Sequence, residues 1–96
     1  MIKNFTLIIP LFNEEEIIEE VLKELFLVIE TLKLDYEIII VDDGCSDNTL
    51  LRIKEITKEN NFKINLISNQ TNKGQSFSIN RGIQASKFKN IITLDG

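Results

Sequence analysis

The chain has 96 residues, enough for one small domain with a thin core. Hydrophobic residues make up 43% of it and charged residues 27%, a balance that excludes a disordered chain. The net charge of -4 comes without any cluster of Lys or Arg, which argues against a nucleic-acid partner, and the single cysteine, Cys45, excludes an internal disulfide.

The first part of the chain predicts a strand followed by a long helix. Residues 5–9 form a compact apolar run closed by Pro10, which favours a strand buried on both faces. Asn13 is expected to cap the helix, and Glu16 completes the pattern of a capping box. The helix is expected to bury one broad apolar face made of Ile17, Ile18, Val21, Leu22, Leu25, Val28, Ile29 and Leu32.

The rest of the chain repeats the alternation of strand and helix. Residues 36–41 form a second β-branched run. The elements predicted after it are a helix capped by Ser46 or Asp47 and ended at 60–61, a strand at 63–68, a helix at 75–86 and a strand at 90–94. This order is typical of parallel strands joined by right-handed crossovers, with helices on both faces of the sheet.

Polar motifs follow each predicted strand, at the edge where such sheets bind ligands. They are residues 13–14 after the first strand, 42–43 after the second, 72–74 after the third and Asp95 after the fourth. Four separate segments converge on one edge, and this convergence predicts a binding site there.

The Asp42-Asp43-Gly44 motif admits two interpretations. Asp42 could hold the neighbouring backbone while Asp43 faces a ligand; because a carboxylate only accepts hydrogen bonds, it suits a base edge that carries an N–H, such as uracil or guanine. The alternative is an ordinary turn with an Asx cap before the second helix. The motif alone does not decide between them.

The other motifs also have a functional and a structural interpretation. Phe12 could stack on a base and Glu14 could bind ribose hydroxyls, or they could be a hydrophobic staple and a favourable charge at a helix start. Lys73 and Gly74 could meet a base or phosphates, or form a plain loop. Asp95 could bind Mg²⁺ or Mn²⁺ with a second ligand. We interpret Cys45 as a packing residue of the turn and Arg81 as part of a helix face that is exposed to solvent.

Taken together, the chain resembles the family 2 glycosyltransferases with the GT-A fold over essentially its whole length. Four segments carry the resemblance, in this order and spacing: LIIPLFNEEE, EIIIVDDGCSDNT, NKGQSFSINRGIQAS and IITLDG. The most similar branch is that of the dolichol-phosphate-mannose-synthase-like enzymes, whose bacterial members act on undecaprenyl phosphate.

The resemblance implies a role for ten positions in nucleotide binding. They are Pro10, Phe12, Glu14, Val41, Asp42, Asp43, Lys73, Gly74, Asp95 and Gly96. Asp43 would meet the base edge with support from Asp42. Asp95 would be the first carboxylate of the family's metal-binding Asp-x-Asp motif, with Gly96 in the middle and the second Asp at position 97. No residue of the chain matches a catalytic base.

We therefore predict a three-layer α/β/α domain with a parallel sheet in strand order 3-2-1-4. Residues 1–96 would form an incomplete GT-A domain, truncated at the Asp-x-Asp motif, that binds nucleotide only. The whole enzyme would use Mg²⁺ or Mn²⁺ and transfer a sugar from a UDP- or GDP-sugar to a polyprenyl phosphate or glycan acceptor. It would act in cell-envelope glycan synthesis, in the cytoplasm or at the inner face of the membrane.

The sequence also admits two rival functions, and it predicts self-association as a further interaction. A nucleotide-binding or scaffold domain could keep the fold without catalysis. A receiver-like phosphoacceptor domain is also parallel α/β, but its acidic pair should follow the first strand, whereas Asp42 and Asp43 follow the second. The uncovered edge of the fourth strand predicts self-association, because bare strand edges pair with other chains.

Overall fold

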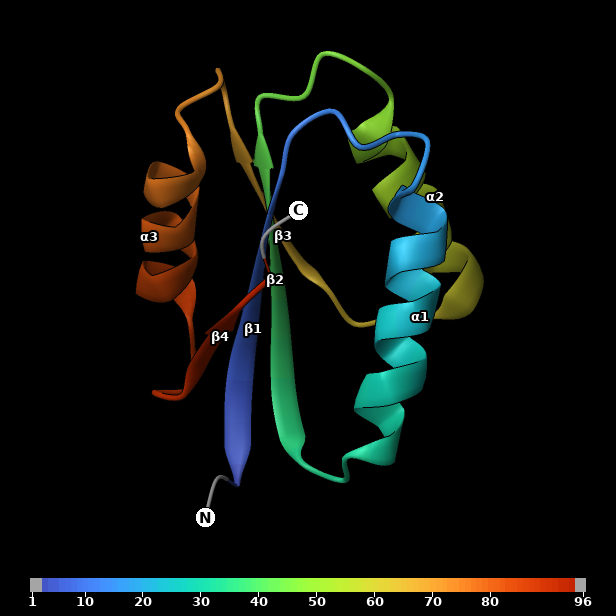
Figure 1. Cartoon of the computed structure of the whole chain (residues 1–96), viewed down its shortest axis with the longest axis vertical. Coiled ribbons are helices and arrows are strands. Elements are labelled where there is room, and N and C mark those ends of the chain that lie inside the picture. The colour runs from blue at the N-terminus through green and yellow to red at the C-terminus, as the bar shows by residue number, and fades with distance from the viewer. Residues whose placement is uncertain (1–2, 95–96) are drawn as a thin grey trace.

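The computed structural model describes residues 3–94, which form a four-stranded parallel sheet. The sheet lies between two layers of helices (Figure 1). The strands are β1 (Asn4–Leu11), β2 (Asp35–Asp43), β3 (Asn65–Asn69) and β4 (Ile91–Thr93). The helices are α1 (Ile18–Thr31), α2 (Thr49–Asn60) and α3 (Gln75–Ala85). The strand order β3-β2-β1-β4, parallel throughout, confirms the predicted fold class and topology. Within residues 3–94, no helix combines the length and apolar character needed to cross a bilayer.

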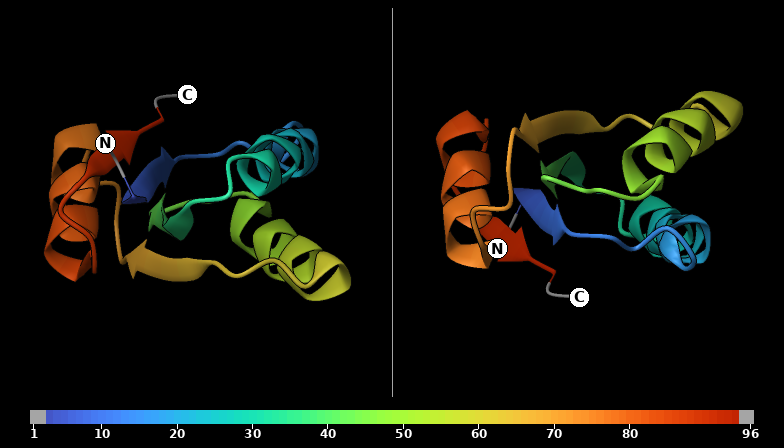
Figure 2. Two further views of the ribbon diagram at one scale, coloured as in Figure 1. Left: turned by 90° about the horizontal axis from the view of Figure 1, so that it is seen from below. Right: turned by 90° about the horizontal axis from the view of Figure 1, so that it is seen from above.

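The core lies on both faces of the sheet, because successive side chains of each strand point to opposite sides. Helix α3 covers one face, while α1 and α2 cover the other (Figure 2). Leu7 and Ile9 of β1 belong to the larger cluster with α1 and α2, whereas Ile8 lies on the α3 side. There Gly82 of α3 sits so close that a Cβ would lie 2.7 Å from the Ile8 side chain.

Strand β1 extends through Pro10 to Leu11, past its predicted end. Thr6 N–H donates to Asn90 O, and Ile8 O accepts from Leu94 N–H, so the even-numbered residues direct their backbone toward β4. Pro10 shares this direction but lies beyond the last β1–β4 pair, which is at Ile8. Its missing N–H therefore breaks no hydrogen bond of the sheet.

Helix α1 begins at Ile18, later than predicted, and its N-cap residue makes no side-chain cap hydrogen bond. Asn13 has a φ of +53° and lies in the loop after β1. Its side-chain oxygen accepts from the backbone N–H groups of Ser46, at 2.9 Å, and Asp47, at 3.3 Å. The predicted capping box of Asn13 and Glu16 is wrong, because Asn13 binds the loop after β2 instead of its own helix.

Helix α1 also buries a narrower face than predicted. The buried residues are Ile18, Leu22, Phe26 and Ile29, of which Phe26 was not expected. Ile17, Val28 and Leu32, by contrast, are exposed. Among the described residues, no helix covers β4 on this face of the sheet (Figure 2), so one flank of α1 has nothing to pack against.

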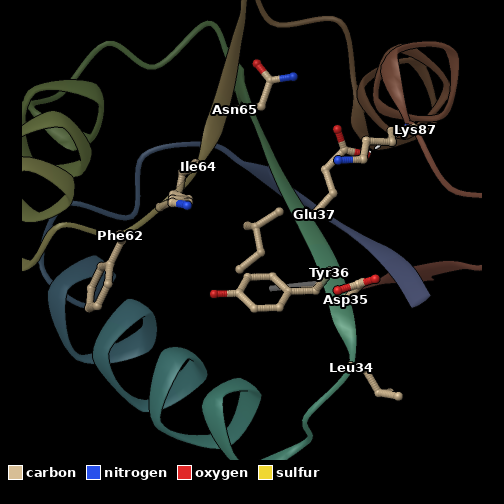
Figure 3. Close-up of a pocket in the computed structure, with 10 residues that line it drawn as sticks. Leu34, Asp35, Tyr36, Glu37, Phe62, Ile64, Asn65 and Lys87 are labelled. Atoms are coloured by element: carbon tan, nitrogen blue, oxygen red, sulfur yellow. Dashed lines mark hydrogen bonds between the residues drawn. The ribbon is translucent and has the colours of Figure 1, made fainter. Parts of the chain in front are cut away.

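Strand β3 starts at Asn65, two residues later than predicted. The ring of Phe62 stacks on Phe26 with 3.9 Å between centroids, which draws the segment before β3 toward α1. Residues 35–38 of β2 consequently pair with β1 but not with β3. The space between residues 35–38 and the segment before β3 is a pocket of about 660 Å³, lined in part by Tyr36 and Phe62 (Figure 3). It lies at the amino ends of the strands, away from the predicted site.

Candidate functional site

The two acidic residues that end β2 point to opposite faces of the sheet, because side chains alternate along a strand. Ile40 packs against α1 and α2, and Asp42 points to the same side. Val41 belongs to the cluster on the α3 side, and Asp43 follows that direction. Asp42 Oδ1 accepts from the Cys45 N–H at 2.8 Å, which tightens the turn after the strand. The alternation thus gives two adjacent carboxylates separate surroundings.

The Asp43 carboxylate holds the segment that joins β3 to α3. Its Oδ1 accepts from the Lys73 N–H at 2.7 Å and from Asn69 Nδ2 at 2.9 Å. Its Oδ2 accepts from the Gly74 N–H at 3.0 Å and from Asn72 Nδ2 at 3.1 Å. A carboxylate has about four lone-pair positions, so donors of the chain itself occupy all of them.

Burial and hydrogen bonding act in opposite directions on Asp43. Burial raises the pKa of this carboxyl, because the ionised form loses its water. The N–H groups of Lys73 and Gly74 and the amide of Asn69 outweigh burial, so the pKa of Asp43 lies below its ordinary value of 3.8. The group is therefore ionised throughout the neutral range.

Gly44, the residue after this pair, allows two loops to pack directly on each other. Its φ is +71°, a conformation that residues with a side chain rarely adopt. A Cβ on Gly44 would lie 2.5 Å from the backbone N of Asn72 and 2.5 Å from the backbone C of Thr71. Glycine is thus required here both by the backbone conformation and by the neighbouring loop.

A buried polar network lies behind Asp43. Asn69 Nδ2 donates to Asp43 Oδ1 and to Ser78 Oγ, both at 2.9 Å. The Asn69 carbonyl oxygen accepts from Arg81 Nη1 at 2.8 Å, and this Nη1 also donates to Ser68 O at 2.8 Å. Asn69 is 5% exposed and Ser78 is fully buried, so the network is largely shielded from water.

Sequence reasoning did not identify this network. It assigned Arg81 to a solvated helix face, and the contacts to Asn69 and Ser68 show that this is wrong. One signal was present in the sequence: Asn69 stands at the end of the third apolar run as Asp43 stands at the end of the second. In the structure the two residues pair in the sheet. A polar residue beside a carboxylate at the end of a buried strand indicates a hydrogen bond between them.

The loop after β1 is fixed by the loop after β2. Glu15 accepts from the Asn48 N–H at 3.2 Å, and the Glu15 N–H donates to Asp47 Oδ2 at 3.4 Å. Asp47 Oδ1 also accepts from the Thr49 N–H at 2.9 Å. The N-cap position of α2 is nevertheless Asn48, which makes no side-chain cap hydrogen bond, so the predicted cap at Ser46 or Asp47 is wrong. The Glu14 N–H donates to Thr49 Oγ1 at 2.8 Å. These bonds fix Glu14 beside the end of β1.

A cleft of about 230 Å³ opens at the carboxyl ends of β1 and β2, where the loops gather at the top of Figure 1. Its lining residues are Pro10, Leu11, Phe12, Glu14, Asp43, Asn72, Gly74 and Gln75. The cleft thus brings together five of the ten predicted positions, from three separate segments. Phe12 is 44% exposed, which leaves its ring available for stacking.

The remaining predicted positions contribute differently. Val41 is fully buried below the cleft, and Lys73 is exposed and contacts Asp43 through its backbone N–H. Asp95 and Gly96 lie outside the described residues. Within residues 3–94, no group of three His, Cys, Asp or Glu side chains is arranged to hold a metal ion. The metal-binding role of Asp95 therefore stays a prediction.

Cys45 is packed into the turn below the cleft. Burial, with a further contribution from the adjacent Asp42 carboxylate, raises the pKa of the Cys45 thiol to about 11. The Cys45 Sγ accepts from the Asn13 N–H at 3.4 Å. A protonated, partly buried thiol is a poor nucleophile, in agreement with a packing role.

Comparisons with solved structures support the fold. A mannosyltransferase from Pyrobaculum calidifontis in complex with GDP-Man and Mn²⁺ superposes with a TM-score of 0.80 and 20% identity, covering 95% of this chain and 26% of that one. Residues 1–349 of S. aureus TarS give a TM-score of 0.77 and 23% identity, covering 96% of this chain and 27% of that one. At these identities the likeness concerns the fold.

Comparisons of sequence determine the family. An uncharacterized protein of Methanocaldococcus jannaschii is 40% identical over 93 residues, which cover 93% of this chain and 38% of that protein. The chain thus spans well under half the length of this relative. The model of the family described as Glycosyl transferase family 2 matches residues 6–96. Because this match covers nearly the whole chain, the chain belongs to glycosyl transferase family 2.

Proposed function

We propose that the chain forms the donor-binding part of a nucleotide-sugar-dependent glycosyltransferase and binds the nucleotide of a UDP- or GDP-sugar in the cleft. The observation that carries the proposal is that Phe12, Glu14 and Asp43, from distant parts of the sequence, line one cleft at the carboxyl ends of the strands. The GDP-Man in the Pyrobaculum mannosyltransferase supports a nucleotide-sugar donor.

Each side chain has a chemical role in this proposal. The exposed ring of Phe12 stacks on the base, a contact worth roughly 1–3 kcal/mol in single-stranded nucleic acid complexes. The Glu14 carboxylate accepts from the ribose hydroxyls. The Lys73 ammonium, on an exposed side chain beside the cleft, compensates phosphate charge.

Asp43 meets the base edge only if one of its present donors gives way. The backbone donors of Lys73 and Gly74 are fixed by the loop. The amide of Asn72 is the more replaceable donor, because this residue is exposed and its bonds to Asp43, 3.1 Å to Oδ2 and 3.3 Å to the backbone O, are the longest. An N–H of uracil or guanine would therefore take the place of the Asn72 amide.

The proposal extends to a divalent cation and an acceptor. Mg²⁺ or Mn²⁺ would be held in part by Asp95, and the Mn²⁺ in the Pyrobaculum enzyme supports metal use. Such a cation stabilises the charge of a departing nucleoside diphosphate. The resemblance to the dolichol-phosphate-mannose-synthase-like branch suggests a polyprenyl phosphate acceptor at the cytoplasmic face of a membrane.

Calorimetric titration with UDP, GDP, CDP and ADP, each with and without Mn²⁺, tests the proposal. We expect UDP or GDP to bind most tightly, because only uracil and guanine carry a ring N–H for Asp43. Tighter binding of CDP or ADP would contradict the role of Asp43, and a chain that binds none of the four has no nucleotide site. The rival scaffold function is excluded if a longer protein containing this domain transfers sugar.

A further inference from the structure

The network behind the cleft has no part in the contacts proposed above. Asn69, Ser78 and Arg81 are absent from the lining of the cleft, yet Asn69 and Ser78 are almost completely buried. A buried polar group that lacks a partner costs about 1–3 kcal/mol, so a set of matched donors and acceptors has to be complete to be tolerated.

The charged groups at the two ends of this network, Arg81 and Asp43, fix the orientation of the Asn69 side-chain amide. The Arg81 guanidinium lies 2.8 Å from the Asn69 carbonyl oxygen, and the Asp43 carboxylate lies 2.9 Å from Asn69 Nδ2. A reversed amide would place oxygen against the carboxylate and NH₂ against the guanidinium. The hydroxyl oxygen of Ser78 accepts the second Nδ2 hydrogen, at 2.9 Å, and completes the set.

The orientation of Asn69 matters because it is passed on to Asp43. With one oxygen held by Asn69, the carboxylate meets the N–H groups of Lys73 and Gly74 at 2.7 Å and 3.0 Å. These two residues form the part of the loop that lies beside the cleft. A chain of hydrogen bonds therefore runs from the middle of α3 to the loop at its start.

We propose that Asn69, Ser78 and Arg81 are positioning residues of the nucleotide site, which fix the Asp43 carboxylate so that it holds Lys73 and Gly74 beside the cleft. The effect on nucleotide binding rests on the proposed function. The effect on Asp43 itself does not, because it is measurable in the protein without a nucleotide.

Removal of the network changes the titration of Asp43 in a defined direction. Three other segments bring charged residues near Asp43: Glu14 lies across the cleft, Lys73 is in the loop and Arg81 is in α3. Asp42, the neighbour of Asp43 in β2, points to the other face of the sheet. Replacing Asn69 removes a donor to the carboxylate but leaves its burial, so Asp43 takes up a proton at higher pH. A protonated Asp43 releases the loop.

Carbon-13 NMR titration of the Asp43 carboxyl in the free protein is the direct test. We expect its midpoint to rise in Asn69→Ala, in Ser78→Ala and, to a smaller extent, in Arg81→Ala. Arg52→Ala is the matched control, because the Arg52 guanidinium pairs with Glu19 and Glu55 on the other face of the sheet and should leave the midpoint unchanged. If Asn69→Ala does not fold, Arg81→Ala decides, since Arg81 is only partly buried.

Nucleotide affinity provides the second readout. For Asn69→Ala we expect a Kd about 3- to 10-fold weaker than wild type at pH 7, with a larger ratio at pH 5. Protonation of the nucleotide affects the Kd of variant and wild type equally, so it drops out of the ratio of the two Kd values at each pH. An unchanged Asp43 midpoint, or a ratio that is constant with pH, overturns the proposal. Shifted midpoints in a protein that binds no nucleotide refute the nucleotide site and leave the network a structural role only.

Discussion

Replacement of Gly44 by alanine tests how closely the loops of the cleft are packed. Left-handed backbone conformation costs a residue with a side chain roughly 1–2 kcal/mol. The new Cβ would also lie 2.5 Å from two backbone atoms, of Asn72 and Thr71, which cannot rotate away as a side chain could. Overpacking of this kind costs about 1–3 kcal/mol. We expect Gly44→Ala to lower the free energy of unfolding by about 2–5 kcal/mol in urea denaturation, and Tm by at least about 10 °C.

Gly44→Asn separates the two contributions. Asparagine is the residue with a side chain that best tolerates a positive φ, so most of the conformational cost disappears while the Cβ contact stays. If the contact reasoning holds, Gly44→Asn is still destabilised by about 1–3 kcal/mol. An asparagine variant as stable as wild type would show that only the backbone conformation matters, and that the loop of Thr71 and Asn72 moves aside without cost.

Three further predictions concern the site and the edge of the sheet. Asp43→Asn should lower the free energy of unfolding at neutral pH by about 2–3 kcal/mol. Because folding lowers the pKa of Asp43 below 3.8, this difference from wild type persists above about pH 4 and becomes smaller at lower pH, as urea denaturation at a series of pH values would show. A deficit that is constant down to pH 2 would contradict an ionised Asp43. Phe12→Ala should weaken UDP or GDP binding by roughly 5- to 100-fold in calorimetry with little change in Tm, whereas Phe12→Tyr should bind as wild type. Ile92, 49% exposed on the open edge strand β4, should promote self-association, so sedimentation should show that Ile92→Lys is monomeric and wild type is not; a monodisperse wild-type monomer contradicts this.

Hydrophobic patterns made the layout of the fold predictable. Each strand lies at or near its predicted position, and α3 matches its prediction to within one residue, because apolar runs and helical spacing reflect burial directly. The alternation of side chains along β2 also indicates that Asp42 and Asp43 have different surroundings. The convergence of loops at the carboxyl ends follows from parallel topology and needs no knowledge of side-chain positions.

The errors arose where the partner of a residue is distant in the sequence. Asn13 has the local signature of a helix cap, but its hydrogen bonds go to residues 46–47. Phe26 is buried against Phe62, and this stacking also moves the first residue of β3 to a later position than predicted. Arg81 looks solvated on a helical wheel, yet it contacts the end of β3. Local patterns cannot show such contacts, because the fold creates them.

The acidic residues around the cleft explain how a chain of net charge -4 could accept an anionic ligand. Asp42, Asp43, Asp47 and Glu15 each accept a backbone N–H from a loop of the site. Their charges are thus compensated by N–H dipoles and serve to join the loops, rather than repelling a ligand from open solution. Because these bonds are made within the chain itself, they order the loops, and less conformational entropy is lost when a nucleotide enters. The phosphates themselves still require positive charge, which Lys73 beside the cleft and a divalent cation would supply.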